Sequence, residues 1–270
     1  MDLEAYFDRI GYDGPRRADR ATLDALCLAH VKAIPFENLD VLLDRGVSLD
    51  DDAVDDKLVR ARRGGYCFEH NTLMARVLAA LGFEVKLLSG RVRISRPADF
   101  VPPRTHVFCR VEIGGESFLA DVGVGGLSPT ASLRLVADVV QQTPHEPRRL
   151  LREPARWLHQ VKLGDAWSDV CELTLEEMPR IDREVANWYT STHPASHFRG
   201  RLMVARALDA GGRLTLLDTK LTVRGRSGEE TREIASRAEL LDVLAERFGL
   251  ELPAGTVFDT PGLAGLAPAP

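Results

Sequence analysis

The chain has 270 residues, a net charge of −5, and 44% hydrophobic and 28% charged residues. This is ordinary globular composition, long enough for one large or two to three compact units. An acidic surface argues against nucleic acid or an anionic membrane as the main partner. The first residues carry charges and no apolar signal core, and no apolar run approaches the roughly 18 residues of a membrane span. We therefore expect a cytoplasmic protein without membrane contact.

The four cysteines are far apart and share no CxxC motif; they are Cys27, Cys67, Cys109 and Cys171. A chain of this size does not need a disulfide framework, and a Cys-rich zinc site would leave a spacing signature. We therefore expect reduced thiols and no metal site.

Residues 2–82 show helical periodicity. Asp2 is a suitable cap for a helix through residue 10, and Thr22 for a second helix toward residue 32. A third helix begins at Cys67, carries an apolar stripe at helical spacing, and ends at Gly82.

From residue 83 to 175 the apolar period changes to two, which indicates strands. The strands are expected over 85–87, 91–94, 107–113, 118–122, 158–163 and 170–175. Several strands in succession favour an antiparallel sheet or a small barrel.

After residue 176 the pattern is mixed. Strands are expected over 202–208 and 214–223, and Ser236 is a suitable cap for a helix over 238–248. The tail from Pro253 is rich in Gly, Ala and Pro and is expected to be loosely ordered.

Cys67 follows a Gly64-Gly65 pair, which permits a tight turn directly before a helix. At the first turn of a helix, free N–H groups and the helix dipole favour the thiolate form of a cysteine. The alternative for any cysteine is a small buried apolar residue. We favour that alternative for Cys27, Cys109 and Cys171, which lie at apolar positions of regular elements, and a functional role for Cys67.

A nucleophilic cysteine needs a base, and the base needs an orienting group. The strand before Gly114-Gly115 and the strand after it form a predicted hairpin with a two-residue turn. Folding at these glycines places His106 and Asp121 on one face as diagonal neighbours, within reach of each other. The same face carries Arg110 and Glu112, which indicates partial exposure and leaves chance placement as the alternative. Together with Cys67, the pair favours a nucleophile, a base and an orienting acid.

Three glycines follow the return strand in the segment 123–126 and would let a ligand approach the backbone. The segment lacks the spacing of a dinucleotide fingerprint, so a pyrophosphate cradle, part of an oxyanion site and a plain loop all remain open. Among the other histidines, His70 lies on the Cys67 face of the helix and is interpreted as a packing or polar-lining residue. His193 and His197 are four apart, but Pro194 argues against a helical metal pair.

The segment 63–71, RGGYCFEHN, resembles the nucleophile motif of the arylamine N-acetyltransferases. The segments 34–39, 105–106 and 121–126 resemble further motifs of that family in the same order, and 187–198 resembles its entry to the last domain. The resemblance covers the whole chain.

The resemblance implies an α+β fold with a helical domain over 1–84, an antiparallel β-barrel domain over 85–185 and an α/β lid domain over 186–270. It implies a papain-like triad in which Cys67 accepts the acyl group, His106 is the base and Asp121 orients it. The reaction implied is ping-pong transfer of acetyl from acetyl-CoA, a cosubstrate, to an aromatic amine, hydrazine or hydroxylamine, with no permanently bound cofactor.

Further roles follow from the resemblance alone. The loop Gly123, Val124, Gly125 and Gly126 would lie against the CoA pyrophosphate, and Phe36 and Phe198 would line the acceptor pocket. Arg63 and Glu69 would form a buried ion pair that holds the turn.

Two departures from the family pattern concern substrate choice. Val124 stands where many members have Phe, which implies a wider acceptor pocket, and His70 stands where Gln or another residue is common. An amide synthase that closes a macrolactam from a carrier-bound acyl chain therefore remains an alternative. A cysteine hydrolase is another, and the intact order of the triad argues against a non-enzymatic binding domain.

Overall fold

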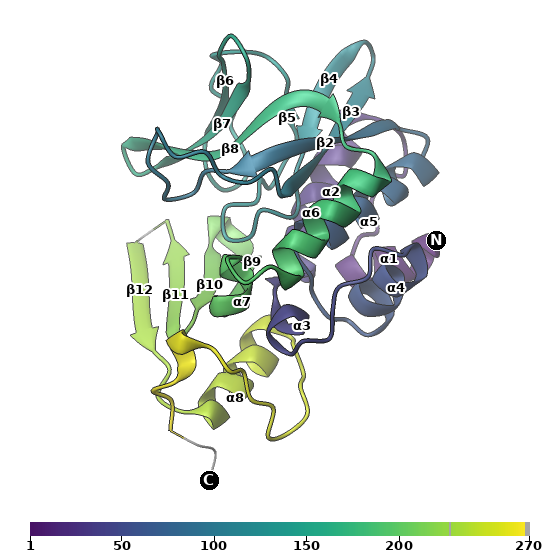
Figure 1. Ribbon diagram of the computed structural model, residues 1–270. Coiled ribbons are helices and arrows are strands. Elements are labelled where there is room, and N and C mark those ends of the chain that lie inside the picture. The colour runs from purple at the N-terminus through teal and green to yellow at the C-terminus, as the bar shows by residue number, and fades with distance from the viewer. Residues whose placement is uncertain (227, 268–270) are drawn as a thin grey trace.

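The computed structural model describes residues 1–226 and 228–267, which form two β-sheets with helices between and around them (Figure 1). Within these residues no helix has both the length and the apolar character that crossing a membrane requires.

The first 80 residues are mainly helical, as predicted. The helices are α1 (Leu3–Ile10), α2 (Arg20–Ala33), α3 (Leu39–Leu42), α4 (Asp51–Asp55), a π-helical turn (Asp56–Arg60) and α5 (Cys67–Ala80). Asp2 caps α1 as expected, because its carboxylate accepts from the N–H of Ala5 at 3.0 Å. Thr22 as the cap of α2 is wrong: Asp19 is the cap, accepting from the N–H of Thr22 at 2.9 Å, so the helix starts earlier.

Seven antiparallel strands in the order β5-β4-β3-β2-β8-β7-β6 form the sheet of the middle segment. They are β2 (Glu84–Val92), β3 (His106–Ile113), β4 (Glu116–Ala120), β5 (Leu133–Arg134), β6 (Arg148–Arg152), β7 (Trp157–Leu163) and β8 (Ala166–Glu177). Gln141 brings the two edges together. Its backbone pairs with Arg148 of β6, and its side-chain amide exchanges hydrogen bonds of 2.8 and 2.9 Å with the backbone of Arg134 in β5. The sheet is therefore a nearly closed barrel, which confirms the predicted architecture.

The hairpin of β3 and β4 has the predicted two-residue turn. Ile113 pairs with Glu116, and the φ angles of Gly114 and Gly115 are 59° and 83°. Two positive φ angles fit a type I′ turn, which glycine adopts without a steric penalty. Strand β4 ends at Ala120, so Asp121 lies just beyond the ladder, not within it as predicted.

The remaining barrel strands differ from the predictions in extent. The segments 85–87 and 91–94 belong largely to one strand, β2, which is irregular in its pairing with β8 between Leu88 and Gly90. Strand β6 was missed because its sequence, RRLLR, lacks apolar alternation; the fully buried Arg148 occupies one of its inward positions.

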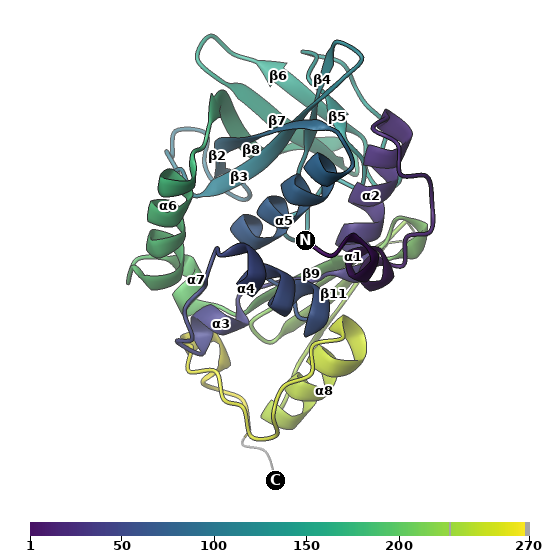
Figure 2. The same ribbon diagram turned by 90° about the vertical axis from the view of Figure 1, so that its right-hand side faces the viewer.

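Helix α5 carries the core between the barrel and the N-terminal helices. Its residues Leu73, Met74 and Val77 are fully buried and belong to one apolar cluster with Cys27 of α2 and Val111 of β3. Figure 2 shows α5 with the barrel on one side and α1 and α4 on the other. The packing of α5 therefore fixes the position of its first residue, Cys67, relative to the barrel.

A second sheet has the order β1-β9-β10-β11-β12. Its strands are β1 (Phe36–Glu37), β9 (Met203–Ala207), β10 (Arg213–Leu217), β11 (Lys220–Gly225) and β12 (Gly228–Glu233), followed by α8 (Arg237–Phe248). Ser236 caps α8 as predicted. The predicted strand over 214–223 is instead a hairpin of β10 and β11 that turns at 218–219. Because β1 pairs with β9, the N-terminal segment is joined to this C-terminal sheet.

The C-terminal tail up to residue 267 is not loose. It includes the 3₁₀ turn Pro261–Leu263, and the side chains of Phe258, Leu263 and Leu266 are buried against α8 and the second sheet. The expectation of a loosely ordered tail is therefore wrong for this part, and residues 268–270 lie outside the described residues.

Helix α6 (Arg180–Thr192) was not predicted, and it is followed by α7 (His197–Gly200). Its residues Ile181, Val185 and Trp188 recur at helical spacing, but they face solvent and are about 60% exposed. Helix α6 lies beside the barrel (Figure 1) and continues across residue 185, where the sequence predicts a domain boundary. The division into three domains stays a prediction.

Candidate active site

Cys67 is the first residue of α5, as predicted from the glycine turn. A Cβ on Gly64 would lie 2.1 Å from the carbonyl oxygen of Pro35, so only glycine allows this close approach. The carboxylate of Glu69 accepts from the N–H of Tyr66 at 2.9 Å, which fixes the start of the helix. The Cys67 side chain is 4% exposed, and its Sγ lies 3.5 Å from the carbonyl oxygen of Thr105.

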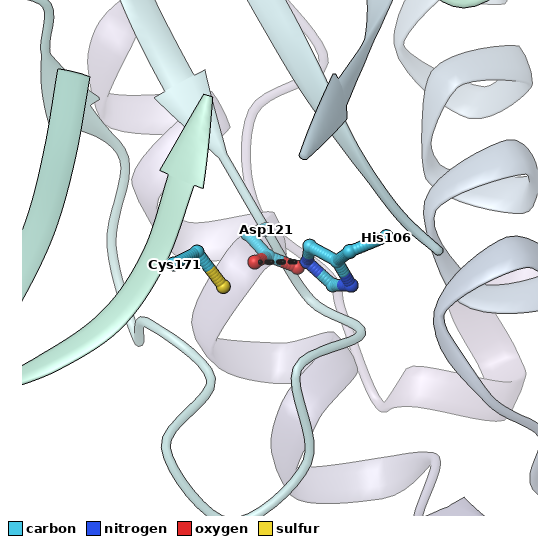
Figure 3. A group of neighbouring side chains, drawn as sticks. All are labelled: His106, Asp121 and Cys171. Atoms are coloured by element: carbon cyan, nitrogen blue, oxygen red, sulfur yellow. Dashed lines mark hydrogen bonds and ion pairs between the residues drawn. The ribbon is translucent and has the colours of Figure 1, made fainter. Parts of the chain in front are cut away.

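His106 and Asp121 are in contact, as the hairpin register indicated. The Nε2 of His106 is 2.7 Å from an Oδ atom of Asp121, as Figure 3 shows. The predicted partial exposure is wrong, because His106 is 1% exposed and Asp121 3%. The ring of Phe108 meets His106 edge-on at 4.6 Å and helps to seal the pair from solvent.

The electrostatics of the pair favour a charged imidazole. Burial lowers the pKa of His106, but the charge and hydrogen bond of Asp121, and a hydrogen bond with the thiol of Cys67, outweigh it and raise the pKa above the usual value. Burial raises the pKa of Asp121, but His106, the amide of Asn71 and the N–H of Gly123 outweigh it and lower the pKa. Nε2 faces the carboxylate, which leaves Nδ1 of the ring for Cys67.

Asn71 is a residue of the site that the sequence interpretation missed. Its Nδ2 donates to the carbonyl oxygen of Val107 at 2.8 Å and to Asp121 at 2.9 Å. Its Oδ1 accepts from the N–H of Val122 at 3.0 Å. One amide therefore ties the helix of Cys67 to the strand that contains His106 and to the loop of Asp121. The available signal was its position four residues after Cys67, on the same helical face.

Cys171 on β8 lies beside the pair (Figure 3). Its Sγ, a ring nitrogen of His106 and a carboxylate oxygen of Asp121 all lie within 4.8 Å of one another. Burial, aided by the nearby charge of Asp121, raises the pKa of Cys171 well above its usual value, so this thiol stays neutral.

A cavity of about 730 Å³ is connected to the site through Thr105, whose carbonyl oxygen lies 3.5 Å from Sγ of Cys67. It runs between α6 and the ends of β2 and β8, and Thr105 lines it. Met178 and Ala186 both line this cavity and belong to the apolar cluster that contains Cys67. The cavity therefore shares two of its lining residues with the apolar cluster around the nucleophile.

Comparison with known proteins adds to this geometry. A family model described as N-acetyltransferase matches residues 19–257. The chain is 44% identical to an arylamine N-acetyltransferase of Escherichia coli over 92% of this chain and 88% of that protein. The chain belongs to the arylamine N-acetyltransferase family. The resemblance noted in its motifs is thereby confirmed, together with the acyltransferase class.

Solved structures agree with this assignment. An arylamine N-acetyltransferase from M. tuberculosis matches with a TM-score of 0.90 at 44% identity, covering 92% of this chain and 94% of that one. One from Mycobacterium marinum in complex with CoA matches with a TM-score of 0.89 at 42% identity, covering 92% and 93%. The predicted α+β fold of the arylamine N-acetyltransferase family is therefore confirmed.

One ion pair expected from the family resemblance is wrong. Glu69 pairs with Lys57 at 2.7 Å, and Arg63 pairs instead with Glu37 at 2.7 Å. One oxygen of Glu69 accepts from the N–H of Tyr66 and the other from Lys57, so both oxygens are already occupied. Both pairs still hold the turn that precedes Cys67.

Three of the other expected site residues, Phe36, Phe198 and Gly123, lie close to Cys67 or to the cluster that contains it. The rings of Phe36 and Phe198 are 6.2 Å apart, and both pack against the cluster that contains Cys67. In the glycine loop, a Cβ on Gly123 would lie 2.8 Å from the Cα of Cys67, and one on Gly125 would lie 3.3 Å from Phe36. The loop thus lies directly against the start of α5.

Proposed function

We propose that the protein transfers acetyl from acetyl-CoA to an aromatic amine, hydrazine or hydroxylamine through an acetyl-Cys67 intermediate. The observation that carries this proposal is the buried 2.7 Å contact of His106 with Asp121, next to a thiol at a helix start. A thiolate and an imidazolium held out of water form the nucleophile of cysteine acyl transfer.

In the first half-reaction the Cys67 thiolate attacks the thioester carbonyl and forms the new S–C bond. The bond to the CoA sulfur then breaks, and the leaving thiolate takes the proton from the imidazolium of His106. In the second half-reaction the amine attacks acetyl-Cys67 and His106 accepts a proton from its nitrogen. The Cys67 thiolate leaves, and enzyme and imidazolium are restored.

Asp121 is the orienting acid in this proposal. One of its oxygens contacts Nε2 of His106, and the other accepts from Asn71 at 2.9 Å and from the N–H of Gly123 at 3.0 Å. Because both oxygens are held, the carboxylate cannot rotate, and the imidazole keeps Nδ1 toward Cys67.

The CoA group is assigned to the glycine loop. The N–H of Gly123 is used by Asp121 and that of Val124 by Ser128, so Gly125 and Gly126 are left to offer N–H groups to a phosphate. The complex of the Mycobacterium marinum relative with CoA supports use of this cosubstrate. Contact of the pyrophosphate with this loop is a proposal.

The acceptor is assigned to the aromatic side of the site. Phe36 and Phe198 offer two ring faces beside Cys67, which suit an aromatic amine. The amide synthase alternative rests on Val124, which is 7% exposed and packs in the apolar core of the barrel. The compared relatives are named arylamine N-acetyltransferases, so acetyl transfer is the function we propose.

The test is a panel of acyl-CoAs and aromatic amines assayed for release of free CoA. Release that depends on both acetyl-CoA and amine supports the proposal. Equal release without amine indicates a hydrolase. No release from any CoA ester, with turnover of a carrier-bound acyl chain, indicates an amide synthase. A cytoplasmic location and a lack of nucleic-acid or membrane partners remain predictions from the sequence.

A further inference from the structure

Three buried aromatic side chains form a hydrogen-bonded chain behind the nucleophile turn. The hydroxyl of Tyr6 in α1 is 2.9 Å from Nδ1 of His30 in α2. Nε2 of His30 is 2.7 Å from Nδ1 of His70 in α5. Nε2 of His70 lies 3.0 Å from the carbonyl oxygen of Gly65 and 3.2 Å from that of Pro35. All three side chains are fully buried.

The two carbonyls fix the direction of every bond in this chain. A carbonyl oxygen only accepts, so Nε2 of His70 must carry a hydrogen. In a neutral His70 the Nδ1 atom is then bare, and Nε2 of His30 must donate to it. His30 is left with a bare Nδ1, which accepts from the hydroxyl of Tyr6. Each imidazole is therefore held in its Nε2–H form.

Both rings are neutral near pH 7. Burial lowers the pKa of His70 to about 4, the cations of Lys57 and Arg9 act in the same direction, and the two carbonyls oppose them. Burial and the neighbouring His70 lower the pKa of His30 well below its usual value, with Arg9 adding to the effect. Tyr6 stays protonated, because burial raises its pKa well above the usual value.

The end of the chain joins two segments of the proposed site. Gly65 lies two residues before Cys67, and Pro35 lies directly before Phe36. The same carbonyl of Gly65 accepts from the N–H of Glu37 at 2.7 Å, and the ring of Phe36 stacks on His70 at 6.4 Å with an angle of 17°. One N–H of His70 thus bridges the nucleophile turn and the acceptor-side segment.

We propose that His70, oriented by His30 and Tyr6, is a positioning residue that holds the Cys67 turn and Phe36 in their relative places through the carbonyls of Gly65 and Pro35. The inference deepens the acetyl transfer proposed above and rests on it. His70 touches neither substrate in this account. Its effect passes through the backbone of residues 35 and 65, which positions Phe36 and Cys67. A displacement of about 1 Å of the reacting groups costs about a hundredfold in rate.

Two matched variants separate the carbonyl bridge from packing. In His70→Gln the side-chain amide replaces the Nε2 donor, whereas in His70→Asn the side-chain oxygen replaces Nδ1 and the donor to the carbonyls is lost. We expect His70→Gln to acetylate Cys67 within about threefold of the wild type, as a shape-conserving change. We expect His70→Asn to be slower by about tenfold to about a hundredfold, with a higher KM for the amine.

Rates are expressed per active site, counted by the acetyl group incorporated without amine, so that misfolded protein does not contribute. A variant that is merely less stable would show fewer active sites with unchanged kcat and KM. Equal rates per site for His70→Gln and His70→Asn would overturn the proposal, and so would a loss in His70→Gln as large as that in His70→Asn.

A second measurement does not depend on catalysis. Nitrogen-15 NMR of the wild-type imidazoles should show His30 and His70 as Nε2–H tautomers that stay neutral from pH 8 to pH 5.5. An Nδ1–H tautomer at His70 would overturn the chain even in an active enzyme. If the wild type acetylates no amine, the proposed function fails, while the tautomers and the iodoacetamide reactivity of Cys67 in the two variants still decide whether His70 positions the turn.

Discussion

The amide of Asn71 donates to Asp121 at 2.9 Å, four residues after Cys67 on the same helix. The helix that presents the nucleophile therefore also holds the carboxylate that orients His106.

We predict that Asn71→Leu folds but acetylates Cys67 about a hundredfold more slowly, because the buried oxygen of Asp121 loses its side-chain donor and keeps only the N–H of Gly123. Rapid-mixing measurement of CoA release in the first turnover gives the rate. The matched control is Thr72→Val, at the next helix position, which is 7% exposed and whose hydroxyl has no hydrogen-bond partner among the described residues. A normal rate of the first turnover in Asn71→Leu would show that Asp121 orients His106 without the hydrogen bond from Asn71.

We predict that Cys67→Ser abolishes acetyl transfer while the fold persists, because a serine hydroxyl is not ionised by a neighbouring imidazole as a thiol is. Wild-type protein mixed with acetyl-CoA and no amine should gain one acetyl group on the peptide that contains Cys67. Mass spectrometry locates it. An acetyl group on Cys27, Cys109 or Cys171 would refute the assignment of the nucleophile.

We predict that Asp121→Asn stays folded and loses turnover by up to roughly 10⁴-fold, the value for the corresponding change in a serine protease. The amide would present its N–H to Nε2 of His106 and favour the wrong tautomer. Steady-state kinetics at saturating acetyl-CoA measure the loss, and far-UV circular dichroism checks the fold. An acylation rate near that of the wild type would mean that another residue orients His106.

Much of the site could be predicted because its signals are local. The turn at Gly114-Gly115 sets the register of its hairpin, and that register brings Asp121, one residue past β4, to the side of the sheet where His106 lies. The glycines before Cys67 mark a helix start that the structure confirms. These features depend on the conformational freedom of glycine and on the period of a strand, which are both properties of short segments.

The features that sequence analysis missed depend on tertiary contacts. Glu69 pairs with Lys57 and not with Arg63, and this pairing depends on the three-dimensional arrangement of the turn before Cys67. Helix α6 was missed because its apolar stripe, with Trp188 60% exposed, faces solvent and its buried face is polar. The hydrogen bond between His30 and His70 joins residues that are 40 positions apart in the sequence. Apolar periodicity predicts single helices and strands, not contacts between distant elements.

We predict that acid destabilises the protein below about pH 6.5 through its buried neutral histidines. Burial, aided by the charge of Arg148, lowers the pKa of His159 to about 3, and burial lowers that of His70 to about 4. A depressed folded pKa means that the unfolded chain binds the proton first, so the free energy of unfolding falls as pH drops from 6.5 toward these values. For His70 the full loss is on the order of 3 kcal/mol.

Urea unfolding at several pH values between 7.5 and 5 measures this slope. His159→Gln, which can still accept from Arg148, should have a shallower slope than the wild type. The control His193→Gln, at the partly exposed end of α6, should keep the wild-type slope. An unchanged slope in His159→Gln would exclude His159 as a source of acid lability.

The last prediction concerns selective alkylation. Iodoacetamide should modify Cys67 rapidly at neutral pH and spare the other three cysteines. Burial raises the pKa of Cys27, Cys109 and Cys171 above the usual value, so these thiols stay protonated in the folded protein. In the proposed mechanism the sulfur of Cys67 reacts as the partner of the His106 imidazolium, at the start of a helix.

His106→Ala should therefore slow the alkylation of Cys67 at neutral pH, because the stabilising cation is gone. Saturating CoA should slow it in the wild type by covering the approach to the sulfur. Asp169→Asn, whose carboxylate lies on β8 and bonds to Gln160, serves as a control that keeps the wild-type rate. Peptide mapping of alkylated protein over a pH series gives the rate at each cysteine. Equal labelling of all four cysteines would contradict the triad. Slow labelling of Cys67 in both wild type and His106→Ala would show that the imidazole does not activate the thiol.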